Sequence, residues 1–397
     1  MAQLSDRLNR LAPSATLAMS QKSNEMKAQG VDVINMSVGE PDFNTPDHIK
    51  EAGKKAIDDN FSKYSPVPGY MDLREAIVDK LKKENHLDYT TGEVIVGTGG
   101  KQGVCNTILA LVNPGDEVII PAPYWVSYPQ MAKLAGATPV IVRAGFEQDF
   151  KMTAEQLEAA ITPKTKMLIL CSPSNPTGSV YSQEELNALA QVILKHEDIF
   201  VLSDEIYEHI NYVGKAASIA SYPGMKERTI ICNGVSNAYA MTGWRLGWVA
   251  APAWIVKGIN KLQGQYTSGT CDVSQKAAVA AYVASQDCVE QMRVAFERRR
   301  DLIVKLAKDI PGLEVNVPQG AFYLFPKCSS FFGKSDGETV INNSTDFAMY
   351  ILEKAHVATV GGDAFGDPDC FRMSYATSDD NIREAMRRIK EVLAVLK

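Results

Sequence analysis

The chain has 397 residues, 45% of them hydrophobic and 22% charged, which excludes a disordered polymer, a collagen-like fibre and a disulfide-stapled miniprotein. Its 47 acidic residues outnumber its 41 basic ones, and the formal net charge of −6 has the wrong sign for a protein that neutralises nucleic-acid phosphates. A small anionic ligand is compatible with this charge, because its site needs only a few local cations.

Cysteine and histidine spacing predicts neither a metal site nor a disulfide framework. The 7 cysteines contain no Cys-x-x-Cys pair, and the 5 histidines show no metal-ligand spacing. The first residues mix charged with apolar side chains, and no apolar run reaches the ~20 residues that cross a bilayer. We therefore expect a soluble, cytoplasmic protein with reduced thiols, no metal, and no membrane or nucleic-acid partner.

Two helices open the predicted fold. Thr45 offers a capping hydroxyl, Pro46 suits the first helical position, and Asp47 places a carboxylate at the positive end of the helix dipole. A second helix is expected after Tyr70, where apolar residues recur four apart.

Short apolar runs then alternate with helical stretches. The runs are 94–96, 118–120, 140–142, 167–171, 200–202, 230–232 and 246–250, and helix-like segments lie at 101–112, 153–160 and 183–195. Continuous apolar runs separated by helices are typical of strands buried on both faces of a mostly parallel sheet.

The pattern changes beyond about residue 272. A long charged helical region is followed by a strand-like segment at 321–325 and a basic amphipathic helix from Asp379. We predict an α/β fold with a large domain at 45–290, whose central sheet carries helices on both faces. A smaller α+β domain is expected from 1–44 and 291–397.

Chemistry is expected just after the strands, because open α/β sheets bind ligands beyond the carboxyl ends of their strands. The glycine-rich segment 97–101 opens a helix, and it suits either a phosphate cradle or a tight connection. Its spacing misses both G-x-G-x-x-G and the P-loop, and no G-x-S-x-G elbow supports a hydrolase. Taken alone, Asn175 suits a turn, Asp204 a helix cap, and Tyr207 ordinary packing.

Taken together and in chain order, the motifs resemble class I aminotransferases, which use pyridoxal 5′-phosphate on the type I fold. The motifs are Ser37-Val38-Gly39-Glu40-Pro41-Asp42, Lys63-Tyr64, Gly99-Gly100-Lys101, Pro123-Tyr124-Trp125, Asn175-Pro176-Thr177-Gly178, Asp204-Glu205-Ile206-Tyr207, Gly243-Trp244-Arg245 and Arg372-Met373-Ser374-Tyr375. The resemblance extends from about residue 13 to 375 and is greatest to the bacterial aspartate/prephenate branch.

The resemblance implies a role for each cofactor-binding residue. Asp204 would face the pyridine nitrogen and keep it protonated, so that the ring can accept electrons from the substrate. Tyr207 and Asn175 would bind the phenolic oxygen. The other implied residues are Trp125 on the ring face, Gly99, Gly100, Lys101, Ser236 and Arg245 around the phosphate, and Tyr64 reaching that phosphate from the partner subunit of a homodimer.

The substrates implied are an amino acid and a 2-oxo acid, with aspartate and 2-oxoglutarate preferred. Arg372 would clamp the substrate α-carboxylate with two parallel bonds, which a lysine cannot do. Thr16 and Lys101 would recognise a distal acidic group. Gly39 would line the substrate site, together with Trp125 and Asn175.

One position departs from the family pattern. Asn237 stands where the family carries the lysine whose amine bonds the cofactor aldehyde and then moves the substrate proton. An amide nitrogen is not basic and can do neither, so we expect the chain to be nearly inactive in transamination. Two other hypotheses remain open: a non-catalytic homologue that binds the cofactor, and a lyase or another aminotransferase of the same fold.

Overall fold

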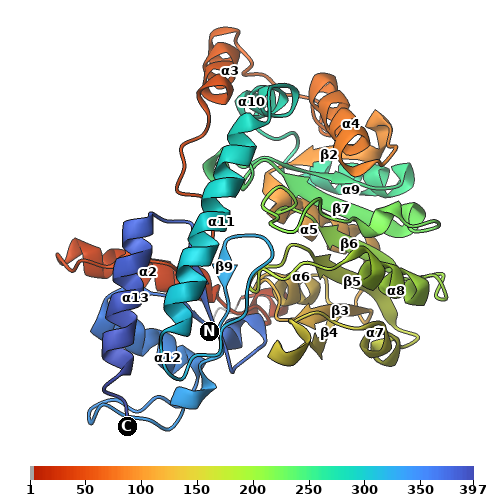
Figure 1. Ribbon diagram of the computed structural model, residues 1–397. Coiled ribbons are helices and arrows are strands. Elements are labelled where there is room, and N and C mark those ends of the chain that lie inside the picture. The colour runs from red at the N-terminus through yellow and green to blue at the C-terminus, as the bar shows by residue number, and fades with distance from the viewer. Residues whose placement is uncertain (1–3) are drawn as a thin grey trace.

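The computed structural model describes residues 4–397, and a seven-stranded sheet forms the middle of its larger part (Figure 1). The spatial order of the strands is β2-β8-β7-β6-β5-β3-β4. Their bounds are β2 Val94–Gly97, β3 Glu117–Ala122, β4 Thr138–Arg143, β5 Thr165–Cys171, β6 Phe200–Asp204, β7 Thr229–Gly234 and β8 Gly247–Ala250. β8 runs antiparallel to both of its neighbours, whereas the other pairings are parallel. The predicted fold class and all seven predicted strands are confirmed.

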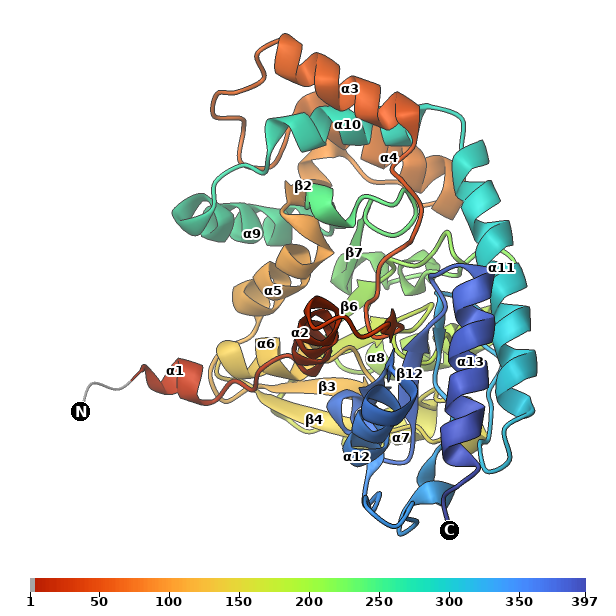
Figure 2. The ribbon, with the colours of Figure 1, turned by 90° about the vertical axis from the view of Figure 1, so that its left-hand side faces the viewer.

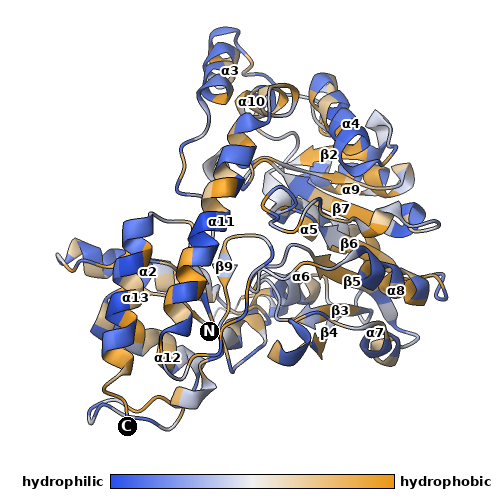
Figure 3. Ribbon diagram, viewed as in Figure 1, coloured by the Kyte–Doolittle hydropathy of each residue, from blue (hydrophilic) through white to orange (hydrophobic). Residues whose placement is uncertain are grey.

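Helices cover both faces of this sheet, as the apolar runs indicated. One face packs against α5 (Gly99–Leu111), α6 (Tyr128–Leu134) and α9 (Ala253–Tyr266). The other packs against α7 (Ala154–Ala160) and α8 (Gln183–Ile193). Figure 3 shows hydrophobic residues along the central strands, whose side chains are removed from water by these helices.

Local capping explains where several helices begin. α4 (Met71–Asn85) follows Tyr70, as predicted, and α3 (Asp47–Asp58) starts directly after Pro46. The prediction that Thr45 caps α3 is wrong: Pro46 itself is the N-cap, and the Thr45 hydroxyl donates to the Ala240 carbonyl at 2.6 Å. α7 and α8 begin at capping boxes formed by Thr153 with Gln156 and by Ser182 with Glu185. The charged region beyond residue 272 forms two helices, α10 (Asp272–Val283) and α11 (Asp287–Lys308).

A smaller unit combines an N-terminal strand with strands from the C-terminal part of the chain. β11 (Val360–Gly361), β12 (Phe371–Ser374) and β9 (Tyr323–Leu324) form an antiparallel sheet, and β1 (Ile34–Asn35) pairs in parallel with β10 (Val357–Ala358). Near this unit lie α2 (Ala15–Ala28), α12 (Ser344–Tyr350) and α13 (Asp379–Leu393), while α1 (Asp6–Asn9) contacts α6 (Figure 2). The short 3₁₀ and π turns are Thr91–Glu93, Phe146–Gln148, Ile219–Ser221, Lys226–Arg228, Thr242–Trp244, Ser329–Phe331, Ile351–Ala355 and Gly362–Phe365.

The expected domain boundary at residue 290 falls inside α11. Val289 of this helix packs with the core under α4 and α10, whereas Phe296 and Ile303 pack in the core of the smaller unit. The helix therefore joins both cores, and the division into 45–290 against 1–44 and 291–397 stays a prediction. Within residues 4–397, no helix is long and apolar enough to cross a membrane.

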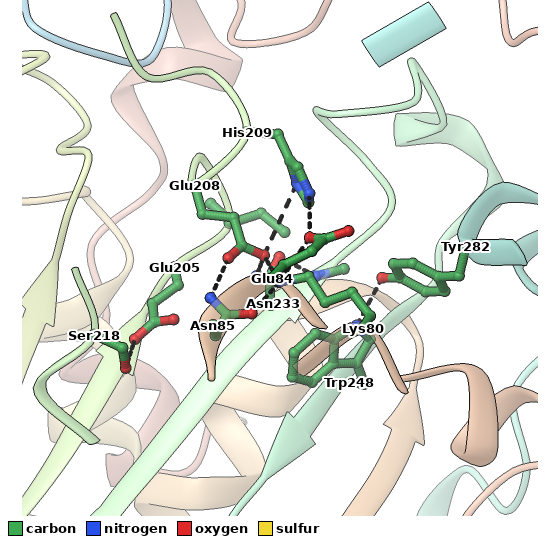
Figure 4. A network of polar contacts seen from close by, with 12 residues as sticks. Lys80, Glu84, Asn85, Glu205, Glu208, His209, Ser218, Asn233, Trp248 and Tyr282 are labelled. Atoms are coloured by element: carbon green, nitrogen blue, oxygen red, sulfur yellow. Dashed lines mark hydrogen bonds and ion pairs between the residues drawn. The ribbon is translucent and has the colours of Figure 1, made fainter. Parts of the chain in front are cut away.

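A buried polar network ties α4 to the segment that follows β6 and to β7 (Figure 4). Glu208 forms an ion pair with Lys80 and accepts hydrogen bonds from Asn85 at 2.8 Å and Asn233 at 2.5 Å. Burial alone would raise the pKa of Glu208, but the Lys80 ammonium lowers it to about 2. Lys80 thus supplies the positive charge beside this carboxylate, and the network joins α4 and β7 to the segment that follows β6.

Glu205 lies beside this network and predicts a pH-dependent stability. Its Oε1 accepts hydrogen bonds from Ser203 at 2.9 Å and Ser218 at 2.6 Å, and burial together with Glu208 raises its pKa to about 7. Between about pH 4.5 and 7, the folded chain therefore holds a proton on Glu205 that the unfolded chain has lost. The free energy of unfolding falls as pH rises through this range, because ionising Glu205 in the folded state would bury a charge.

We expect Glu205→Gln to be more stable than the parent at pH 8, by about 1–3 kcal/mol, and to lose most of this advantage at pH 5. The neutral amide keeps an acceptor for both serines and carries no buried charge. Urea unfolding at both pH values measures the difference, with the exposed Glu75→Gln as a control. An equal stability gap at pH 5 and pH 8 would contradict the assignment.

Candidate active site

A cavity of about 400 Å³ lies beyond the carboxyl ends of β5, β6 and β7. Residues from the N-terminal segment, the large sheet and the smaller unit all line it. The predicted site residues that it brings together are Thr16, Gly39, Gly100, Lys101, Trp125, Asn175, Asp204, Tyr207, Ser236, Asn237, Arg245 and Arg372. Residues predicted from motifs far apart in the sequence thus line one cavity.

Asp204 ends β6 and lies at the floor of the cavity. In the sheet register it stands between Cys171 of β5 and Cys232 of β7. Tyr128 donates a hydrogen bond to Asp204 Oδ2 at 2.7 Å, and the Ile206 amide donates to Oδ1 at 3.3 Å. Burial raises the pKa of Asp204 to about 6, although both hydrogen bonds act to lower it. A cationic ligand group beside this carboxylate would favour its ionised form.

Tyr207 comes from the turn that follows Asp204. Its hydroxyl is 2.8 Å from that of Tyr323, and burial raises the pKa of both phenols. Sequence reasoning missed Tyr323 and Tyr128 as cavity residues. Tyr323 belongs to an apolar strand and Tyr128 to a short helix, so both match the pattern of core aromatics.

An anion cradle forms where α5 begins. Gly99 has a φ of +78°, and a Cβ there would lie 2.5 Å from an Arg245 guanidinium nitrogen. The absence of a side chain therefore lets Arg245 reach the helix N-terminus, whose free N–H groups favour an anion. Arg245 Nη1 donates to the Thr242 carbonyl at 2.9 Å, which holds the guanidinium in place. Gly99 supports this cradle without lining the cavity itself.

Arg372 is buried, and it has no counterion among the residues that the structure describes. Its Nη1 donates to Asn175 Oδ1 at 2.9 Å and its Nη2 to the Ser37 carbonyl at 2.5 Å, while Nε has no hydrogen-bond partner among the described residues. Burial lowers its pKa, and no carboxylate in residues 4–397 pairs with it. A buried charge is costly unless it is paired, so this guanidinium fits an anionic ligand.

Lys101 adds a third positive group to the cavity wall. Its Nζ lies 4.9 Å from the centre of the Trp125 ring, and partial burial and Arg245 lower its pKa. Thr16 at the start of α2 shares a hydrogen bond of 3.0 Å with Ser14 and also faces the cavity. The cavity therefore suits a ligand that carries several anionic groups.

Asn237 is 6% exposed and lines the cavity just beyond β7. Lys101 is the one lysine that lines the cavity in the described part of the chain. The position thus offers an amide and no amine. The lysine-to-asparagine interpretation rests on the sequence motif and stays a prediction.

Tyr64 lies apart from the other predicted residues. It is fully exposed between α3 and α4 and does not line the cavity of its own chain. The expectation that it serves a partner subunit therefore stays a prediction.

Comparison with known proteins assigns the family. The model of the family "Aminotransferase class I and II" matches residues 31–389. The chain is 49% identical over 399 residues to an aspartate/prephenate aminotransferase of Cereibacter sphaeroides, covering 100% of both chains. It is 48% identical to a bifunctional aspartate aminotransferase and glutamate/aspartate-prephenate aminotransferase of Petunia hybrida, covering 99% of this chain and 83% of that protein.

Solved structures share the whole fold. The aspartate aminotransferase of Rhizobium meliloti superposes with a TM-score of 0.96 at 42% identity, covering 100% of both chains. The Thermus thermophilus aspartate aminotransferase with maleate gives a TM-score of 0.93 at 40% identity, covering 99% of this chain and 100% of that one. By sequence and by fold, this chain belongs to the class I and II aminotransferase family.

Proposed function

We propose that the chain binds pyridoxal 5′-phosphate, the cofactor of its family, and has the binding site for amino transfer between aspartate, or a related amino acid, and 2-oxoglutarate. The observation that carries the proposal is Arg372, a buried guanidinium that pairs with no carboxylate of residues 4–397, in the same cavity as the buried carboxylate of Asp204. The relatives with similar sequences are named as aspartate/prephenate aminotransferases. Prephenate and aromatic amino acids are therefore alternative substrates.

The residues present fit this cofactor. The start of α5, Ser236 and Arg245 would hold its phosphate, and Trp125 would stack on its ring. Asp204 would hold the proton on the ring nitrogen, while Tyr207 and Asn175 would bind the ring oxygen. When bound, the cofactor supplies an electron sink for the bond that breaks at the substrate Cα.

The rest of the cavity would orient the substrate. Arg372 would bind the α-carboxylate through two parallel hydrogen bonds, and its contact with Asn175 fixes the plane of the guanidinium. Lys101 and Thr16 would bind a second carboxylate further along the substrate. Arg372, Lys101 and Thr16 would then hold the substrate Cα against the cofactor ring and restrict its orientation.

Asn237 limits what this site can do. Its amide cannot bond an aldehyde as an amine does, and it cannot accept the Cα proton. We therefore propose that the chain binds the cofactor and the substrates but transfers the amino group very slowly. Asn237 is also the observation that favours the second candidate, a non-catalytic protein that binds the cofactor. A homodimer is part of the proposal, supported by the full exposure of Tyr64 on its own chain.

The acidic preference predicts the behaviour of Lys101→Met in the Asn237→Lys background. Loss of one charge-assisted hydrogen bond should lower kcat/KM for aspartate about 10–100-fold and leave alanine, which has no side-chain carboxylate, nearly unchanged. A panel of amino donors assayed for the 2-oxo acid product measures this, with the exposed Lys261→Met as control. Equal losses for both donors would remove the aspartate assignment, and products of elimination would favour a lyase.

A further inference from the structure

Tyr323 contacts both Tyr207 and Arg372, to which the proposed function gives different roles. Its hydroxyl is 2.8 Å from that of Tyr207, and the two rings meet edge to face at 84° with centres 5.7 Å apart. Its ring face lies under Arg372, whose guanidinium carbon is 4.6 Å from the ring centre. One buried side chain thus contacts both the expected partner of the cofactor oxygen and the expected carboxylate clamp.

Gly39 makes this arrangement possible. A Cβ at position 39 would overlap the Tyr323 hydroxyl oxygen, so any other residue would force that hydroxyl away from Tyr207. The backbone near Gly39 also contributes the Ser37 carbonyl that binds Arg372. The N-terminal segment therefore packs directly against the Tyr323 hydroxyl.

We propose that Tyr323 is a positioning residue, whose hydroxyl orients Tyr207 and whose ring seats Arg372. The inference rests on the proposed function. A phenol has one O–H donor and two acceptor lone pairs. When Tyr323 donates to Tyr207, the Tyr207 proton is free to point at a ligand oxygen. The two consecutive hydrogen bonds then polarise and strengthen each other. The Tyr323 ring supplies cation–π attraction to a guanidinium that no described carboxylate pairs with.

These two tasks use different atoms, so two substitutions separate them. Tyr323→Phe removes the hydroxyl and keeps the ring, whereas Tyr323→Leu removes both. Tyr375→Phe is the matched control, because Tyr375 is equally buried and its hydroxyl bonds the Ala321 carbonyl at 3.2 Å, away from the cavity.

The first readout is optical titration of pyridoxal 5′-phosphate bound to the parent chain. A strong donor at the ring oxygen favours its ionised form, so the pH midpoint of the absorption change should rise in Tyr323→Phe and stay unchanged in Tyr375→Phe. The cofactor should also bind about threefold to tenfold more weakly to Tyr323→Phe. In a Tyr207→Phe background, Tyr323→Phe should shift the midpoint no further. A shift that persists without the Tyr207 hydroxyl would overturn the proposal.

The second readout is the affinity of the cofactor-loaded protein for maleate, a dicarboxylate without an amine. Tyr323→Leu should weaken maleate binding about threefold to tenfold, while Tyr323→Phe should leave it unchanged. Equal maleate affinity in Tyr323→Leu and the parent would overturn the role of the ring. If the parent failed to bind the cofactor, the proposed function itself would fall, and an unchanged midpoint in Tyr323→Phe would refute the present inference alone.

Discussion

The Asn237→Lys variant is expected to transfer the amino group from aspartate to 2-oxoglutarate about 10²–10⁴-fold faster than the parent chain, which is the range that general acid–base catalysis contributes. The restored amine can accept and return the Cα proton, and it can also bond the cofactor aldehyde. Position 237 lines the cavity, so the longer side chain has space into which to extend. Initial rates with saturating cofactor measure the effect.

A matched variant separates basicity from size. Asn237→Gln lengthens the side chain and keeps a non-basic amide, so it should remain as slow as the parent. A lysine variant that binds the cofactor and stays as slow as the parent would contradict the aminotransferase proposal and favour the non-catalytic candidate. A glutamine variant as fast as lysine would show that space, rather than proton transfer, limits the parent.

Arg372→Lys in the Asn237→Lys background is expected to lower kcat/KM for aspartate about 10²–10³-fold. Truncating one partner of a buried, hydrogen-bonded charge pair costs about 2–5 kcal/mol, and a lysine cannot reproduce the two parallel bonds of a guanidinium. The variant should still fold, because Arg372 has no carboxylate partner in the described chain that its loss would leave unpaired. Steady-state kinetics and thermal unfolding together measure both expectations.

Arg299→Lys is the control for burial. Arg299 is also a buried arginine, but it pairs with Asp42 at 2.7 and 3.0 Å and does not line the cavity. Its substitution should lower the stability and leave kcat/KM nearly unchanged. If Arg299→Lys reduced kcat/KM as much as Arg372→Lys does, the carboxylate-clamp role of Arg372 would be wrong.

The large sheet could be predicted because each of its strands has a signal within its own short stretch of sequence. Strands buried on both faces need continuous apolar runs, and each of the seven runs became a strand. α2 and α9 were not predicted, and the extent of α11 was missed. α2 mixes polar with apolar residues and buries only Ser23, so no clear apolar stripe marks it. α11 is one helix that packs in both hydrophobic cores. The spacing of its apolar residues does not indicate where it leaves one core and enters the other.

The site was predicted in so far as its residues follow strand ends. Asp204 ends β6, Asn175 and Asn237 come a few residues after β5 and β7, and the cavity brings the three together. The contacts of Tyr323 and the missing counterion of Arg372 depend on how distant segments pack, which no spacing rule contains. Tyr64 requires a second chain, so a single chain leaves its role a prediction.

The most direct test of the proposed function is a crystal structure of the parent chain soaked with pyridoxal 5′-phosphate. We expect the phosphate at the start of α5, the ring nitrogen within hydrogen-bond distance of Asp204, and no bond between the cofactor and residue 237. Cofactor absent from this cavity, or a ring whose nitrogen is out of reach of Asp204, would contradict it.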